Sequence, residues 1–149
     1  MRAVVQRVDY SKVQVNDEII GNIEKGLLVL LGIEDSDTDI DMKYMVDKIV
    51  NLRIFEDSND KMNLSLLDIQ GDLMVVSQFT LYGDCRRGRR PNFMGAAKPD
   101  FANDMYEKFL VEARSIVNNV QSGSFGAHMN ISLLNNGPVT ILLDSNKNF

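Results

Sequence analysis

Two uninterrupted apolar runs constrain the fold of this chain more than any other feature. Leu27–Leu31 reads Leu-Leu-Val-Leu-Leu and ends at Gly32, and Leu73–Val76 reads Leu-Met-Val-Val. Apolar runs without polar alternation are typical of strands that are buried on both faces of a sheet. We therefore expect two central strands that are covered on both sides by other layers of the protein.

Two segments have the apolar spacing of amphipathic helices. In the first, Thr38 or Asp39 can cap a helix, and the acidic residues of Asp35–Asp41 complement the dipole at its start. Its buried stripe is Met42, Met45, Val46 and Ile49. Pro99 opens the second helix, whose stripe is Ala102, Met105, Tyr106, Phe109, Ala113 and Ile116.

The two ends of the chain contain further strand patterns. Near the start, Arg2–Val8 and Lys12–Val15 read as two strands joined by a turn at residues 9–11. Near the end, the apolar pattern of Asn130–Asp144 predicts a hairpin with Asn135-Asn136-Gly137-Pro138 as its turn. Pro138 cannot donate a backbone hydrogen bond to a ladder. The turn is therefore either an ordinary corner or a rigid backbone site for hydrogen bonding.

Together these patterns predict about eight strands and two main helices, with strands grouped at both ends of the chain. The predicted fold class is α/β: one domain over residues 1–149, a three-layer α/β/β arrangement with mixed β-sheets, and residues 145–149 as a loose tail. Two helices cannot cover both faces of such a sheet. A second sheet layer or a subunit partner is expected on the other face.

Composition excludes several classes of protein. The 149 residues are 44% hydrophobic, which suits one domain with a substantial core. The single Cys85 cannot form an internal disulfide, and no metal motif, phosphate loop or dinucleotide fingerprint occurs. Neither a signal peptide nor an apolar run long enough to span a membrane is evident. We expect a soluble cytoplasmic protein without a metal or cofactor.

Charge is distributed unevenly along the chain. The net charge of −5 argues against a protein that coats nucleic acid. Arg86–Arg90, however, places four arginines within five residues. This run is either a solvated loop or a contact for one phosphate-bearing end of a nucleic acid.

Few side chains are suited to conventional catalysis. Ser77 follows a buried strand and is a conceivable nucleophile, but the G-x-S-x-G pattern is absent. His128 is the only histidine, so a Ser-His-Asp triad has a single candidate base and is disfavoured. Cys85 is better interpreted as an incidental thiol, although neighbouring arginines would lower its pKa. The chain is therefore either a binding or structural module, or an enzyme that relies on backbone groups and on its substrate.

Six short motifs, taken in their order along the chain, form a recognisable set. They are Gln6-Arg7-Val8, Gly26–Gly32, Lys61-Met62-Asn63, Ser77-Gln78-Phe79-Thr80-Leu81, Gly88-Arg89-Arg90-Pro91 and Asn135-Asn136-Gly137-Pro138-Val139-Thr140. This set resembles the bacterial D-aminoacyl-tRNA deacylases, collinearly from Met1 to about Leu143. Each motif alone is weak, but the ordered set is highly specific. Asn136 and His128 stand where aspartate is common in that family.

The resemblance implies a homodimeric cytoplasmic hydrolase that cleaves the ester between a D-amino acid and the 3′ end of tRNA, and that removes glycine mischarged on alanine tRNA. Gly137-Pro138 would be a Gly-cisPro motif that reaches into the partner's site, accepts the substrate's α-amino group and excludes L-amino acids. The substrate's ribose 2′-OH would assist hydrolysis. The implied catalytic positions are Ser77, Gln78, Phe79 and Thr80, and the implied substrate-binding positions are Gly137, Pro138, Arg7, Phe125 and Met129.

Two other functions remain open at this stage. One is a serine esterase for small substrates with Ser77 as nucleophile. The other is a non-catalytic dimer that binds RNA ends through Arg86–Arg90.

Overall fold

The two apolar runs form the centre of a six-stranded mixed sheet. The computed structural model describes residues 1–149. Strands β3 (Gly26–Gly32) and β6 (Asp72–Ser77) are parallel neighbours, with Leu28 opposite Met74. The strand order is β2-β1-β3-β6-β7, and β8 pairs with the free edge of β1. The other strands of this sheet are β1 (Arg2–Val15), β2 (Glu18–Ile23), β7 (Val120–Ser122) and β8 (Asn130–Asp144).

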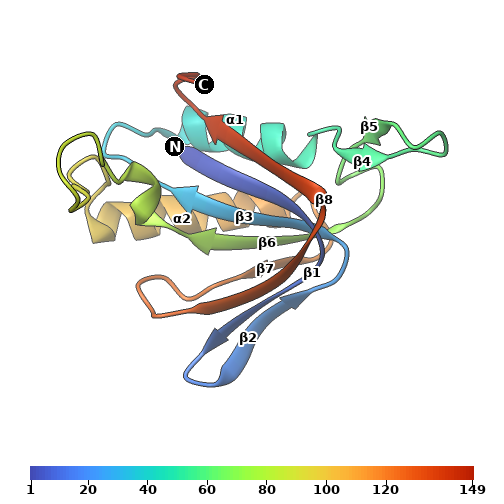
Figure 1. Ribbon diagram of the computed structural model, residues 1–149, viewed down its shortest axis with the longest axis horizontal. Coiled ribbons are helices and arrows are strands. Elements are labelled where there is room, and N and C mark those ends of the chain that lie inside the picture. Colours follow the sequence, from blue (N-terminus) through green and yellow to red (C-terminus); the bar gives the residue numbers. More distant parts are fainter.

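Both predicted helices form, and they cover one face of the sheet (Figure 1). Helix α1 (Asp39–Val50) begins with a capping box: the Asp41 amide donates to the Thr38 hydroxyl, and the Thr38 amide donates to the Asp41 carboxylate. Helix α2 (Pro99–Arg114) has its proline in the first turn, where no amide donor is needed. Both helices therefore form where the apolar spacing predicted them, but the stripe of the second was drawn too long: Ile116 lies beyond the end of α2 and is exposed.

Two apolar clusters divide the interior into three layers. The larger lies between the sheet and the helices and includes Val29 of β3, Met45 of α1 and Phe109 of α2. The smaller lies on the opposite face and includes Leu28 of β3 and Ile23 of β2. Alternate residues of β3 therefore enter opposite clusters, as strand geometry requires. Because β2 also contacts β6 and β7, the bent sheet supplies its own third layer, and the predicted α/β/β arrangement is confirmed.

β1 is one continuous strand, so the predicted turn at residues 9–11 is wrong. Residues 2–8 pair with β3, and residues 11–15 pair with β2. Register shifts on either side of Val8 mark the bend from one layer to the next. Polar residues within a strand that bends between layers resemble a turn when only the sequence is considered.

β8 is also continuous, and the predicted closing hairpin is therefore wrong. It runs antiparallel to β1 from Asn130, opposite Gln14, to Asp144, opposite Arg2. Four residues, 136–139, lie opposite the single residue Arg7, so they form a bulge larger than the usual two residues opposite one. The Gly137–Pro138 peptide bond within it is cis. Pro138 is tolerated because β8 lies at the sheet edge, where a missing amide donor interrupts no second ladder.

The remaining segments are short. Strands β4 (Phe55–Glu56) and β5 (Met62–Leu64) form a separate two-stranded sheet, and a 3-10 helix, η1 (Phe79–Tyr82), follows β6. At the end of the chain, the Ser145 amide donates to the Met1 carbonyl at 2.8 Å, and Asn146 and Asn148 bond to the Asp144 carboxylate. None of the helices has the length and apolar character needed to cross a lipid bilayer.

Candidate active site

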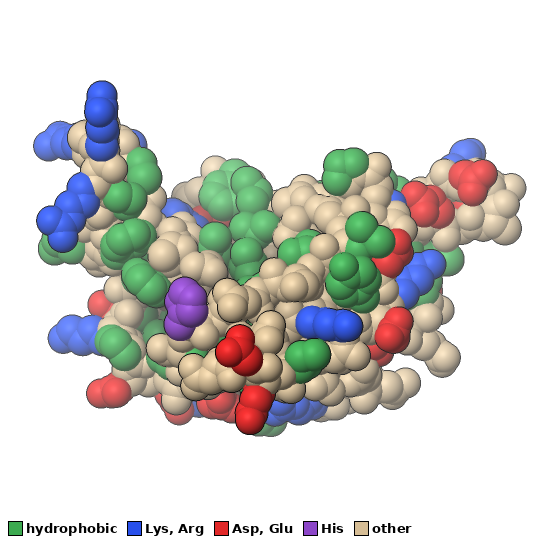
Figure 2. All heavy atoms as spheres, turned by 60° about the horizontal axis from the view of Figure 1, so that its bottom comes forward, with side chains coloured by type: hydrophobic (Ala, Val, Ile, Leu, Met, Phe, Trp, Pro, Cys, Tyr) green, Lys and Arg blue, Asp and Glu red, His purple; other side chains and the backbone are tan.

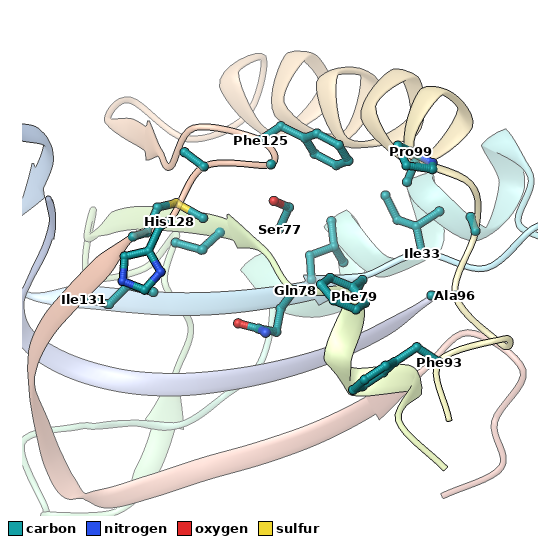
Figure 3. A pocket seen from close by; sticks show the side chains of 17 residues that line it. Ile33, Ser77, Gln78, Phe79, Phe93, Ala96, Pro99, Phe125, His128 and Ile131 are labelled. Atoms are coloured by element: carbon teal, nitrogen blue, oxygen red, sulfur yellow. The ribbon is translucent and has the colours of Figure 1, made fainter. Parts of the chain in front are cut away.

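An apolar cavity of about 610 Å³ opens where β3 and β6 end (Figure 3). The end of β6, the 3-10 helix, the start of α2 and the segment 125–129 form its walls. Twelve of its 17 lining residues are hydrophobic, and none is Asp, Glu, Lys or Arg. The cavity therefore suits a ligand that is recognised by shape and by a few polar groups rather than by charge.

Five residues that the sequence proposed for the site converge on this cavity. Ser77 and Gln78 come from the end of β6, Phe79 opens the 3-10 helix, and Phe125 and Met129 lie across from them. Phe79 is 59% exposed and packs edge-on against Phe93, with ring centroids 5.2 Å apart. Thr80 does not line the cavity, although its hydroxyl accepts a hydrogen bond from the side-chain amide of Gln78.

No nucleophile-base pair is assembled in the cavity. The Ser77 side chain lies inside it, whereas His128 lies at its edge and is exposed (Figure 3). The Ser77 hydroxyl has no hydrogen-bond partner in the protein, and no carboxylate lines the wall. A triad would need the serine to bond its base and the base to bond an acid. The arrangement does not provide this chain of hydrogen bonds.

Two unpaired backbone donors lie at the edge of the cavity, on Phe79, which lines it, and on Thr80, the next residue. Phe79 and Thr80 are the first two residues of the 3-10 helix, and neither amide donates a hydrogen bond within the chain. The backbone N–H of Gln78, by contrast, donates a hydrogen bond to the Leu31 carbonyl at 2.8 Å. Free N–H groups at the start of a helix favour negative charge. They can therefore stabilise an oxyanion that forms beside Phe79.

Tyr106 connects two of the segments that form the cavity, β6 through a neutral hydrogen bond and the segment 125–129 through the Phe125 ring. Tyr106 of α2 is buried, and its hydroxyl donates to the Val75 carbonyl of β6 at 2.9 Å. Its ring lies 6.0 Å from that of Phe125. Burial raises the pKa of the Tyr106 hydroxyl to about 12. The phenol therefore stays neutral and keeps β6 and the segment 125–129 in place.

Arg7 organises the second region, the bulge in β8. Its side chain is almost fully buried, at 3% exposure. The guanidinium donates to the Asn136 carbonyl and to the Asn136 side-chain oxygen, both at 3.1 Å, and to the Ile54 carbonyl at 2.6 Å. It also lies 3.1 Å from the carboxylate of Glu56, which is 47% exposed. One rigid cation thus connects β1, β8 and the segment before β4.

Neighbouring side chains complete this bulge. The Asn136 side chain donates to the Asp9 carboxylate at 2.7 Å, and the Val139 amide donates to the Asn135 side chain at 2.9 Å. Gly137 and Pro138 are themselves exposed and do not line the cavity of their own chain. Of the proposed residues, Arg7, Gly137 and Pro138 therefore form a second group, separate from the five at the cavity.

Sequence reasoning missed several cavity residues. Ile33, Phe93 and Pro99 belong to the wall, and His128, which the sequence offered only as the base of a disfavoured triad, lies at its rim. They come from segments far apart in the chain, so only the folded arrangement reveals them. The one available signal was the large aromatic side chain of Phe93 directly after the polar, arginine-rich residues 84–92.

The fold and the site define a small α/β protein whose ligand cavity is uncharged and whose polar groups are mostly backbone. Residues 4–144 match the family model described as D-Tyr-tRNA(Tyr) deacylase. A D-aminoacyl-tRNA deacylase of Clostridioides difficile is 63% identical over 149 residues, and one of Thermosipho africanus is 58% identical over the same length. Both matches cover all of this chain and all of the relative.

Solved structures agree with this match. The structure of a c-Myc DNA unwinding element binding protein is 41% identical, with a TM-score of 0.92 over 97% of this chain and 98% of that one. A probable eukaryotic D-amino acid tRNA deacylase shares the fold, with a TM-score of 0.83 over 95% of this chain and 97% of that one, at 21% identity. The chain belongs to the D-aminoacyl-tRNA deacylase family, whose members are hydrolases that act on ester bonds.

Proposed function

We propose that this protein hydrolyses the ester between a D-amino acid and the 3′ end of tRNA, releasing the free amino acid and the tRNA. The observation that carries the proposal is an uncharged cavity with two unpaired backbone N–H groups beside it, that of Phe79, which lines the cavity, and that of Thr80, the next residue. Membership of the deacylase family supports the same chemistry. The substrate is made where proteins are synthesised, so the proposed location is the cytoplasm.

In this mechanism, water attacks the ester carbonyl and the bond to the ribose oxygen breaks. The amides of Phe79 and Thr80 stabilise the oxyanion, and such a donor contributes roughly 10²–10³ in rate in well-studied hydrolases. The neighbouring ribose 2′-OH activates the ester, so positioning replaces a strong side-chain base. Phe125 and Met129 hold the terminal adenosine, and the Gln78 side chain orients the Thr80 turn through its hydrogen bond.

Chiral selection is proposed to come from a second copy of the chain. Gly137 and Pro138 are exposed on an edge strand and lie outside their own cavity, which suits a segment that completes the cavity of a partner. Their carbonyl groups accept the substrate's α-amino group and leave no room for the side chain of an L-amino acid. Glycine has no side chain to exclude, so glycine on alanine tRNA is also a substrate.

The test compares hydrolysis of matched D- and L-tyrosyl-tRNA by the purified protein without added metal or cofactor. We expect rapid loss of the D-ester and survival of the L-ester. Cleavage of both esters would contradict the proposed selection against L-amino acids. Survival of both would reject the hydrolase assignment in favour of RNA-end binding. A monomeric mass at micromolar concentration would separately reject the role of Gly137 and Pro138 in a partner's cavity.

A further inference from the structure

An arginine-rich tip projects from the loop between η1 and α2. We call residues 85–91 the arginine tip; it carries Arg86, Arg87, Arg89 and Arg90, all exposed. Figure 2 shows basic side chains gathered on this projection at one end of the molecule. Its base is closed by two hydrogen bonds between Asp84 and Asn92, at 2.7 and 3.0 Å. The tip is therefore a held projection rather than a loose connection.

The four arginines differ in whether their charge is already neutralised. Arg86 donates two hydrogen bonds to the Asp84 carboxylate, at 2.9 and 2.7 Å, and this contact holds the pKa of Asp84 well below its usual range. Arg87, Arg89 and Arg90 take part in no ion pair. Three uncompensated guanidinium groups thus project from a chain whose net charge is −5. This concentration is suited to phosphate, which arginine binds through paired hydrogen bonds.

The arginine tip is continuous with the cavity. Asn92, which closes its base, is followed directly by Phe93, and Phe93 lines the cavity and packs on Phe79. Arg90 is three residues before Phe93, so their Cα atoms are at most about 11 Å apart. A strand whose last nucleotide occupies the cavity would pass close to the tip.

We infer that Arg87, Arg89 and Arg90 bind the backbone phosphates of the tRNA acceptor strand, next to the nucleotide in the cavity. The inference rests on the proposed function and extends it from the terminal ester to the body of the tRNA. Phosphate contacts position a nucleic acid without reading its sequence. The tip therefore serves tRNAs in general, and the local charge explains how an acidic protein holds a polyanion.

The expected size of the effect follows from counterion release. Each phosphate contact contributes about 0.7–0.9 to the slope of log affinity against log salt concentration. Near physiological salt this corresponds to roughly two- to fivefold in affinity for each contact. Loss of all three contacts should weaken tRNA binding by roughly ten- to a hundredfold and flatten the slope by about two to three.

The experiment replaces the three residues together, Arg87→Gln, Arg89→Gln and Arg90→Gln, and compares two substrates. One is D-tyrosyl-tRNA, and the other is D-tyrosyl-adenosine, which has the same ester but no phosphate backbone. The control variant carries Lys43→Gln, Lys48→Gln and Arg114→Gln, which changes the net charge equally on exposed positions of α1 and α2. A fourth variant, Arg86→Gln, removes the arginine that Asp84 already neutralises.

We expect the triple arginine variant to lose kcat/KM on D-tyrosyl-tRNA through KM, with a flatter salt dependence, and to retain its rate on D-tyrosyl-adenosine. The control variant should retain its rate on both substrates. Arg86→Gln should lower kcat/KM on D-tyrosyl-tRNA by less than the mean loss per arginine in the triple variant. Equal losses on both substrates would overturn the inference, because the tip would then shape the cavity. Unchanged rates on both would also overturn it.

Failure of the proposed function gives a different result. In that case the unmodified protein would hydrolyse neither substrate, and the salt dependence of binding to uncharged tRNA would still test the arginine tip. Retained tRNA binding by the triple variant, together with lost binding to phosphatidylserine vesicles, would assign the tip to a membrane surface and overturn the inference.

Discussion

The cavity and the β8 bulge hold their positions by different physical means. The cavity is lined mainly by apolar side chains, and Tyr106 connects two of its segments through a neutral hydrogen bond and a ring contact. The bulge is instead held by a buried cation, with Arg7 bonded to Asn136 and Ile54 and paired with Glu56. Both regions belong to the proposed reaction, yet only one depends on charge.

This difference fits the task proposed for each region. Apolar packing tolerates small adjustments, which suits a cavity that receives a flexible nucleotide end. Only Val139 of the bulge is buried in the core, whereas Gly137 and Pro138 are exposed on an edge strand, so their shape needs directional bonds from a rigid donor. We therefore expect substitutions at the bulge to cost more, in both stability and activity, than polar substitutions in the cavity.

The largest effect should come from Arg7→Ala. This change leaves the Ile54 and Asn136 carbonyls without their donor and opens a void beneath the bulge. We expect the free energy of unfolding to fall by about 2–4 kcal/mol. Deacylation of D-tyrosyl-tRNA should fall at least a hundredfold, because the segment 136–139 loses its support. Urea unfolding followed by circular dichroism, with activity measured below the transition, checks both.

Two companion variants separate geometry from charge at Arg7. Arg7→Lys keeps the charge but lacks the planar fork, so it should recover only part of the stability. Glu56→Gln removes a half-exposed partner and should cost less than about 1 kcal/mol. If Arg7→Lys behaved like the unmodified protein, the fork geometry would be irrelevant and the contrast between the two regions would be lost.

Gly137→Ala should have the next largest effect. Gly137 has φ of +125°, and an added Cβ would lie 2.8 Å from the Val139 side chain and 2.9 Å from the Arg7 guanidinium. The strained backbone should cost about 1–3 kcal/mol of unfolding free energy. Activity should fall by more than tenfold, because the displaced segment is the one proposed to enter the partner's cavity.

Gly88→Ala is the matched stability control for that change. Gly88 also has a positive φ, +70°, but no atom lies within 4 Å of an added Cβ. Gly88→Ala should lower the free energy of unfolding by only about 1–2 kcal/mol, from backbone strain alone. Equal destabilisation by the two substitutions would show that contact with Arg7 and Val139 contributes nothing.

At the cavity, Tyr106→Phe should lower the free energy of unfolding by about 1 kcal/mol near neutral pH, because the Val75 carbonyl loses its donor. Above pH 10 the difference in unfolding free energy should shrink and then change sign, so that the variant becomes the more stable protein. The folded protein holds the Tyr106 proton up to a pKa of about 12, whereas an unfolded tyrosine loses it near pH 10. Between these values the unmodified protein loses roughly 1.4 kcal/mol per pH unit from this group, and the variant does not.

Urea midpoints measured below and above pH 10 give the test for Tyr106. Tyr82, whose pKa burial also raises, is present in both proteins and cancels in the comparison. Parallel stability curves above pH 10 would contradict the prediction, because they would mean that Tyr106 ionises equally in both states.

The parts of the fold that repeat a simple period could be predicted from sequence. The runs at β3 and β6 and the stripes of α1 and α2 follow from burial, and the structure has these elements where the pattern placed them. β1 and β8 could not be predicted correctly, because a strand that bends between layers carries polar residues at the bend. Pairing partners, rather than composition, distinguish such a bend from a turn.

The same limit applies to the site. Ser77 was identified because it follows a buried strand and matches a family motif, and Gln78, Phe79 and Arg7 because of the resemblance alone. Nothing in the sequence shows that Arg7 bonds the Ile54 carbonyl, or that Phe93 packs on Phe79. Those contacts depend on a fold that joins segments more than ten residues apart.

The smallest effect should come from Ser77→Ala, which most directly tests the view of the cavity as a positioning site. The Ser77 hydroxyl has no partner in the protein, so its loss should leave stability nearly unchanged and lower kcat on D-tyrosyl-tRNA less than about tenfold. Removing a true serine nucleophile costs roughly 10⁶ in kcat. A loss of that size with the fold intact would establish a serine esterase mechanism. Backbone donors and the substrate's own hydroxyl would then be insufficient, and the cavity would depend on a reactive side chain after all.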